Sequence, residues 1–204
     1  MHIPSSDTVQ INVLSFEEAL LGSERKEYDS SKWLYVPDFY SEYRYILGTK
    51  GHNPLICIGI NPSTAEPDNL DNTLSSVQRI ALHNGFDSFI MFNVYAQRAT
   101  DPDHMEKNFN SFLHQENMKA FEYVLSCCDS QPTVWAAWGT IIEKRPYLVS
   151  CVQNMIEIGK NYNARWVSVG KRSKKSGHPH HPLYLKKDSC IDPFDIRSYL
   201  EGLK

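Results

Sequence analysis

The sequence lacks any apolar run near the roughly 20 residues that a membrane-spanning helix needs. Residues 1–10 also lack the basic-then-apolar order of a signal peptide. Cysteine is scarce and odd in number: of the five, Cys127 and Cys128 are adjacent, and no pair has the two-residue gap typical of zinc ligands. We therefore expect reduced thiols in a cytoplasmic protein that does not associate with a membrane.

An excess of basic charge is missing as well. Lys and Arg together number 21 against 24 Asp and Glu, so the formal net charge is −3. A chain of this charge has no global basic field for nucleic acid, and any such contact must come from a local patch. One loop is the candidate patch, with Lys171, Arg172, Lys174 and Lys175. A solvated charged face is the other interpretation of this loop.

No linker, internal repeat or low-complexity tract divides the chain. Its 204 residues, with a hydrophobic share of 41% and a charged share of 22%, are typical of one globular domain with a substantial core. We predict a single domain over residues 1–204, with an N-terminal flank at 1–50 and a core at 51–204.

The strongest local pattern begins at residues 55–58, where Leu-Ile-Cys-Ile forms an unbroken apolar run of strand length. Such a run favours a strand covered on both faces, as in a parallel sheet. Gly59 then allows a turn, and Pro62 fixes φ where the strand must stop. Asn61 lies between them, at the carboxyl end of a buried strand, where open α/β sheets bind ligands.

Apolar strand-length runs alternate with helical patterns along the rest of the chain. After the run at 55–58, strands are expected at 89–92, 133–138 and 165–169. Helices are expected at about 72–84, 109–127, 141–158 and 192–203, and the one at 141–158 should be interrupted or begin at Pro146. This alternation predicts a three-layer αβα fold with a central, mainly parallel four-stranded sheet. Shorter runs at 33–36 and 43–47 predict an antiparallel N-terminal flank.

Four strand-end motifs follow in an order that resembles the uracil-DNA glycosylase superfamily, in its mismatch-specific and single-strand-selective branches. They are Gly-Ile-Asn-Pro at 59–62, the apolar run ending in Asn93, Trp-Gly at 138–139 and the late loop at 178–183. The resemblance implies that Asn61 positions the water that attacks the sugar C1′ and that Asn93 reads the base edge. It also implies that a late-loop histidine supports the departing base, while this loop presses into the minor groove.

The chain resembles more closely a bacterial and phage family of unknown function, DUF1643. The resemblance spans about 43–185 and is carried by Asn-Pro-Ser-Thr-Ala at 61–65, Arg-Ala-Thr-Asp at 98–101 and His-Pro-Leu-Tyr-Leu at 181–185. It implies no assigned reaction. Ser63 replaces the glycine or aromatic residue usual among the glycosylases, which changes the expected pocket wall. Either His178 or His181 could match the glycosylase histidine, and His181 is preferred because Pro-Leu follows it.

Cleavage of an N-glycosidic bond passes through an oxocarbenium-like sugar and an anionic leaving base. A site therefore needs an oriented water, a donor near the base and exclusion of bulk solvent. The amide oxygen of Asn61 can orient water, although capping of the turn before Pro62 explains the same residue. His181 can donate to the base. We expect the remaining substrate contacts from Gly59, Pro62, Ser63, Asn93, Arg98 and Asp101.

Arg98 has two interpretations. It could bind phosphate while Asp101 holds it in place, or the two could form an ion pair within their own loop. Strand-end asparagines such as Asn93 also often bond only to their own loop.

Together these residues predict a nucleobase-recognising hydrolase, similar to a DNA glycosylase, that acts on a modified base. We expect DNA or a nucleotide as its partner, no obligate protein partner, and neither a metal nor an organic cofactor. A non-catalytic binder of a modified base or nucleotide is one alternative. Another is a metal-dependent hydrolase that uses the histidines at 178–181 with Glu66, Asp68 or Asp71.

Overall fold

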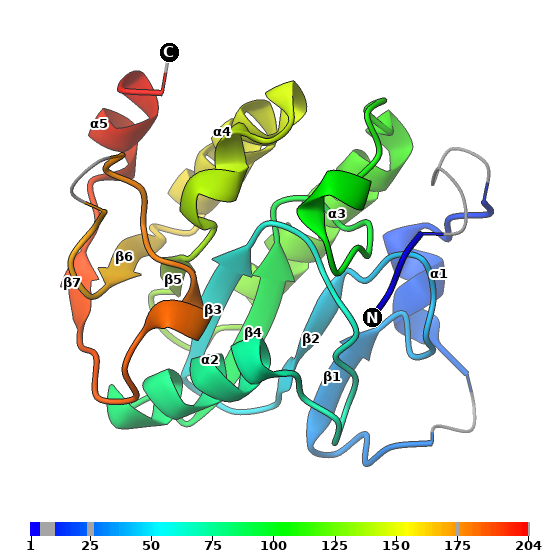
Figure 1. The fold of residues 1–204 in the computed structure, drawn as a ribbon. Helices are drawn as coiled ribbons and strands as arrows, with labels where there is room; N and C mark the ends of the chain where they lie inside the picture. The colour runs from blue at the N-terminus through cyan, green and yellow to red at the C-terminus, as the bar shows by residue number, and fades with distance from the viewer. Residues whose placement is uncertain (5–10, 24–26, 174–175, 204) are drawn as a thin grey trace.

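The computed structural model describes residues 1–4, 11–23, 27–173 and 176–203, which form a seven-stranded sheet with helices packed on it (Figure 1). The strands are β1 (Trp33–Val36), β2 (Ile46–Thr49), β3 (Pro54–Gly59), β4 (Ser88–Asn93), β5 (Thr133–Ala136), β6 (Arg165–Val169) and β7 (Ile191–Pro193). Their order across the sheet is β1-β2-β4-β3-β5-β6-β7. β3 pairs in parallel with β4 and β5, and β5 with β6, whereas the β1–β2, β2–β4 and β6–β7 pairings are antiparallel.

Helices cover both faces of the sheet (Figure 1). One face carries α1 (Phe16–Leu21), α3 (Ser111–Ser126), α4 (Pro146–Asn161) and α5 (Ile196–Glu201), and the other carries α2 (Asn72–His83). The connections include the short 3-10 helices η2 (Pro102–His104), η3 (Gly139–Glu143) and η4 (Pro182–Tyr184). None of the helices in the described ranges is long and apolar enough to cross a membrane.

β3 is buried along its whole length because it lies between the two helical layers. Ile56 and Ile58 pack into the core beneath α3 and α4, whereas Leu55 and Cys57 pack into the core beneath α2. Successive strand residues point to opposite faces, so a strand covered on both sides needs apolar residues at every position. This two-sided burial is the physical reason for the unbroken run at 55–58.

The expectation of a mixed α/β fold is confirmed, and the antiparallel flank is present as β1 and β2. The sheet is larger than the four strands expected, because it has seven: β4, β3, β5 and β6 pair in parallel, β2 and β1 continue it in antiparallel pairs on one side, and the unexpected β7 does so on the other. The closing helix expected at 192–203 is instead β7 followed by α5, since Asp195 caps a new helix by accepting from Ser198 N at 3.1 Å. The helix expected at 141–158 is divided into η3 and α4, which begins at Pro146.

The sequence signals at helix ends are confirmed where the structure tests them. Asp71 caps α2 through Oδ1, which accepts from Leu74 N at 2.9 Å, and Gly85 follows its end with a φ of +82°. Ser15 and Glu18 form the capping box of α1.

The connections at the carboxyl ends of the strands diverge around β3. β3 leads to α2 on one face, whereas its neighbours β4 and β5 lead to α3 and α4 on the other. Neighbouring strands whose connections leave toward opposite faces open a crevice, and open α/β sheets bind ligands there. The end of β3 is therefore where this fold places a site.

We expect Phe121→Ala to lower the free energy of unfolding by about 3–5 kcal/mol. Phe121 lies on α3, is fully buried, and has its ring centroid 5.2 Å from that of Phe92 on β4. Phe112→Ala is the matched control on the same helix, because Phe112 is 45% exposed and its loss should change stability by no more than about 0.5 kcal/mol. Urea unfolding measures both variants, and equal losses would contradict this description of the core.

Candidate functional site

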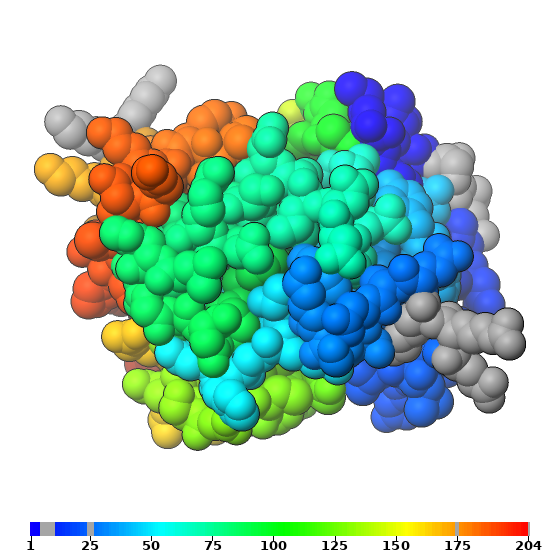
Figure 2. Space-filling model, turned by 90° about the horizontal axis from the view of Figure 1, so that it is seen from below, coloured from blue at the N-terminus to red at the C-terminus, as the bar shows by residue number. Residues whose placement is uncertain are grey.

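A cavity of about 710 Å³ lies at the carboxyl ends of the central strands. Its walls come from the end of β3 and the next loop (59–64), the first turn of α2 (71–74), the loop after β4 (99–102), the segment after β5 (138–141), Ser173 and the late loop (178–184). The late loop contacts α2 through η4, and Figure 2 shows this loop (orange) beside α2 on the face that α2 covers. Segments far apart in the sequence therefore meet around one space.

Asn61 lines this cavity and is held by its amide nitrogen. Nδ2 donates to the backbone oxygen of Ala99 at 2.7 Å and to that of Pro62 at 3.1 Å. Oδ1 accepts no hydrogen bond from any described residue, and the side chain is only partly buried. The amide is thus fixed in orientation with its acceptor left for a ligand or water.

The loop after β3 is tied to the loop after β4. Ala99 N donates to Pro62 O at 2.9 Å, and the hydroxyls of Ser63 and Thr100 lie 3.1 Å apart. Gly59 at the end of β3 is closely packed: a Cβ there would lie 2.6 Å from the Met91 methyl carbon and 3.1 Å from Asn93 Nδ2, so the end of the Met91 side chain would have to move. Gly59 and Ser63 line the cavity, whereas the buried Pro62 supports the wall from behind.

Asn93 is 1% exposed and lies beneath the cavity rather than among its lining residues. Its Oδ1 accepts from the Arg44 guanidinium at 3.4 Å, and its Nδ2 is buried without a hydrogen-bond partner. Arg44, also 1% exposed, does line the cavity. At the place where the sequence predicts a base-reading amide, the structure therefore presents a guanidinium with the amide behind it.

Arg98 is fully buried and does not line the cavity. It donates to the backbone oxygens of Ser63 and Ala65 and to the Tyr35 hydroxyl, and its guanidinium carbon lies 4.3 Å from the Tyr40 ring centroid. Asp101 instead accepts from Asp103 N at 2.9 Å and begins η2. Among the described ion pairs, none joins Arg98 to Asp101, so Asp101 is not what holds this arginine.

Both ring nitrogens of His178 are engaged by the protein. Nδ1 lies 2.7 Å from the Tyr199 hydroxyl, and Nε2 lies 3.3 Å from Glu143 Oε1. The Tyr199 hydroxyl also accepts from Trp138 Nε1 at 2.9 Å, so it joins His178 to the segment after β5 as well. This 1% exposed imidazole is a structural link between the late loop and α5.

His181 is the imidazole left for a ligand. Nδ1 accepts from Leu183 N at 3.4 Å, whereas Nε2 has no partner within the described parts of the chain. Burial lowers the pKa of His181, and the carboxylate of Asp71 partly opposes this. The ring is therefore neutral at pH 7, with its proton on Nε2 and a donor available to the cavity it lines.

The basic loop lies beside the cavity rather than inside it. Lys171 and Arg172 are exposed, and the Arg172 guanidinium carbon lies 5.7 Å from the Phe194 ring centroid. Lys174 and Lys175 lie outside the described residues. Ser173 is the member of this segment that reaches the cavity wall.

The late-loop histidines do not assemble a metal site in the part of the chain that the structure describes. Three or more His, Cys, Asp or Glu side chains come together nowhere in these ranges in a way that could hold an ion. His180 lines the cavity, but His178 is already bound to Tyr199 and Glu143.

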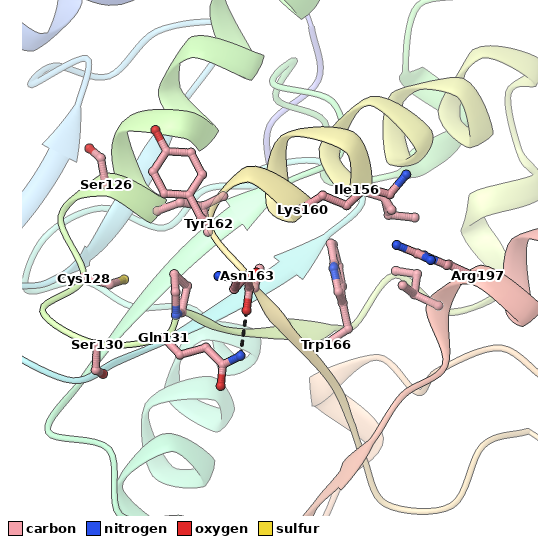
Figure 3. A pocket seen from close by; sticks show the side chains of 14 residues that line it. Ser126, Cys128, Ser130, Gln131, Ile156, Lys160, Tyr162, Asn163, Trp166 and Arg197 are labelled. Carbon is pink, nitrogen blue, oxygen red and sulfur yellow. Dashed lines mark hydrogen bonds between the residues drawn. The ribbon is translucent and has the colours of Figure 1, made fainter.

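A second hollow, of about 1,010 Å³, lies where the chain enters β5 and β6 from the ends of α3 and α4 (Figure 3). Lys160, Trp166 and Arg197 are among its lining residues, and Gln131 Nε2 donates to the backbone oxygen of Asn163 at 2.8 Å across it. It contains none of the site residues that the sequence predicts, and we place the candidate site in the cavity around Asn61.

Arg44 is the site residue that our sequence reasoning missed. It lies just before β2 within an apolar run, Tyr-Arg-Tyr-Ile-Leu at 43–47, which we read only as part of a flanking strand. The sequence feature that could have revealed it is an arginine inside an apolar run, because arginine is almost never fully buried unless it is paired. Tyr199 and Glu143, which position His178, have no comparable feature in the sequence around them.

We expect Asp71→Asn to lower the pKa of His181 further, because the variant removes the charge that opposes burial. An NMR titration of the histidine ring protons measures this. His52 is the internal control: its hydrogen bond to Asp129 raises its pKa, which should stay unchanged in D71N and fall in D129N. A rise in the His181 pKa in D71N would contradict the geometry described above.

The comparisons with known proteins give one result. The family model for DUF1643, a protein family of unknown function, matches residues 44–183. No curated protein and no solved structure matches the chain, so neither comparison supports the resemblance to glycosylases. The matched segment begins at Arg44 and includes Asn61 and His181, which line the cavity, and the buried Arg98, which does not. The chain belongs to the DUF1643 family.

Proposed function

We propose that this protein recognises a nucleobase and hydrolyses the N-glycosidic bond that joins it to a sugar. The observation that carries the proposal is the pair of groups that the cavity leaves unused. Asn61 is held by its amide nitrogen with Oδ1 free, and His181 has a free Nε2 in the same cavity. An acceptor for water and a donor for a leaving group are what this reaction needs from a protein.

Asn61 acts on the water. Oδ1 accepts a hydrogen bond from a water molecule and turns its lone pair toward the sugar C1′. An amide is too weak a base to deprotonate water, so the C1′–N bond breaks first and the water adds to the oxocarbenium-like sugar. The proton that the added water then loses is taken up by the departed base anion, which leaves a sugar hydroxyl at C1′ and a neutral base. The bonds to Ala99 and Pro62 keep the amide from rotating during this step.

His181 acts on the departing base. The base leaves with the electron pair of the C1′–N bond, and the Nε2 proton of His181 stabilises that charge by hydrogen bonding. A neutral imidazole suffices, and the lowered pKa keeps it neutral at pH 7. The cavity volume of about 710 Å³ falls in the range of roughly 300–1,000 Å³ that small-molecule sites occupy, so it admits a nucleoside while limiting bulk water.

The substrate is DNA or a nucleotide, and we propose a modified base because Ser63 departs from the glycosylase motif. Exposed Lys171 and Arg172 beside the cavity are suited to phosphate contacts on a longer strand. Asn93 has no direct part in the proposal, since it lies beneath the cavity floor. Five free cysteines favour the reducing cytoplasm as the location.

Asn61→Ala is expected to reduce base release by about 10²–10³-fold while leaving ligand affinity within about threefold, because the water loses its acceptor. The assay incubates oligonucleotides carrying a panel of modified bases and measures alkali-labile abasic sites. Asn53→Ala is the matched control. Asn53 is exposed and precedes β3, so it lies at the amino-terminal end of the strand, whereas the cavity lies at the carboxyl end.

The same assay separates the alternatives. A non-catalytic binder would retain the oligonucleotide without producing abasic sites at any time, and loss of activity in EDTA would favour the metal-dependent hydrolase. Equal turnover by N61A and N53A would remove Asn61 from the mechanism.

Substitutions of His181 and His178 should have different effects. His181→Gln is expected to reduce base release by about 10²-fold with little change in stability, because its Nε2 makes no bond within the described protein. His178→Gln should instead lower the melting temperature, since it breaks the link to Tyr199. Thermal unfolding and abasic-site formation measured on both variants test this, and the reverse pattern would assign the catalytic role to His178.

A further inference from the structure

Two guanidinium groups are buried side by side at the carboxyl end of the sheet. Arg44 and Arg98 are 1% and 0% exposed, and both donate to the backbone oxygen of Ala65, at 3.1 and 3.3 Å. None of the ion pairs between described residues includes either arginine. Buried charges in proteins are normally paired with an opposite charge, so this pair lacks the partner that its burial calls for.

Donors at this place also outnumber acceptors. Arg44 has five N–H donors and makes two hydrogen bonds, to Ala65 O and Asn93 Oδ1. Its Nε, the Nε of Arg98 and the Nδ2 of Asn93 are all buried without a partner. A buried donor without an acceptor costs stability. Three such donors lie close together without an acceptor, and Arg44 is the one of the three residues that lines the cavity. We therefore expect the missing acceptor to come from a ligand that contacts Arg44.

The remaining surroundings add positive potential at the same point. The first turn of α2, at Asn72 and Thr73, lines the cavity, and the first N–H groups of a helix have no partner within the helix. Asp71 is the carboxylate in this wall, where its Oδ1 accepts from Leu74 N. Its negative charge favours the charged form of Arg44 and opposes part of this positive potential, but it forms no ion pair with either arginine among the described residues. Burial and the charge of Arg98 lower the pKa of Arg44 to about 9, so the group still carries its charge at pH 7.

We infer that Arg44, together with the amino end of α2, forms a phosphate-binding subsite at the floor of the cavity. Arg44 makes the contact, and Arg98, which does not line the cavity, adds charge behind it. A guanidinium presents several N–H donors in a fork that matches phosphate oxygens. The inference deepens the proposed function, on which it rests for the rest of the ligand: the substrate is a nucleotide bound through its phosphate and not a free nucleoside or base.

The first test uses inorganic phosphate as the probe and thermal unfolding of the full chain as the readout, at constant ionic strength. At a concentration about tenfold above Kd, phosphate is expected to raise the melting temperature of the wild type by roughly 3–5 °C. Arg44→Lys keeps the charge but loses Nε and the fork, and should lose most of this rise. Arg165→Lys is the matched control, because Arg165 is exposed on β6 and away from the cavity.

Phosphate also stabilises proteins without binding, and that effect would be equal in all three proteins. An equal rise in the wild type, R44K and R165K would therefore overturn the inference. Calorimetric titration of the wild type keeps the test decisive if R44K does not fold. A saturable isotherm supports the subsite, and a titration with no saturable heat contradicts it.

The source of the phosphate is tested with three further probes: thymidine, thymidine 5′-monophosphate and a thymidine oligonucleotide without a terminal phosphate. At least tenfold tighter binding of the monophosphate than of thymidine indicates a terminal phosphate. If only the oligonucleotide binds at least tenfold more tightly than thymidine, the subsite holds a backbone phosphate. Equal affinity for all three probes contradicts the subsite. Base release is assayed separately, so a phosphate effect without base release would overturn the hydrolase and leave the subsite standing.

Discussion

The carbonyl oxygen of Ala65 is the point on which the candidate site depends. It accepts hydrogen bonds from Arg44, which precedes β2, and from Arg98, which follows β4, while belonging itself to the loop after β3. Three segments are joined there by charge-assisted bonds, which are among the stronger hydrogen bonds in proteins. The position of Asn61, four residues earlier in the same loop, follows from this junction.

The N-terminal segment is consequently part of the site and not a cover over one edge of the sheet. It supplies Arg44, the Tyr35 hydroxyl that accepts from Arg98 at 3.0 Å, and the Tyr40 ring that lies against the Arg98 guanidinium. These contacts hold two like charges close together in a buried place. Such an arrangement is costly without a counter-charge, and its persistence in the fold is best explained by a ligand that provides one.

The histidines of the late loop have different roles: His178 holds the loop in place, and His181 has a free nitrogen at the cavity. His178 is held between Tyr199 and Glu143, which fixes the loop against α5, and this leaves His181 three residues later with a free Nε2 at the cavity. A rigid support beneath an uncommitted group is what precise positioning requires. The pairing of loops across β3 and β4 does the same for Asn61, whose amide is held from one side only.

Periodicity and local chemistry in the sequence were sufficient for the mixed α/β fold, the helix caps at Asp71 and Ser15, and the placing of Asn61 at a strand end. These features depend on neighbours along the chain, which a sequence displays directly. The edge strand β7 was missed because it has three residues, the last of them Pro193, and so short a segment shows little pattern. The roles of Arg44, Asn93 and the two histidines were decided only by tertiary structure. Hydrogen-bond partners 21 to 49 residues away determine which polar groups are occupied and which remain free, and no local pattern encodes that choice.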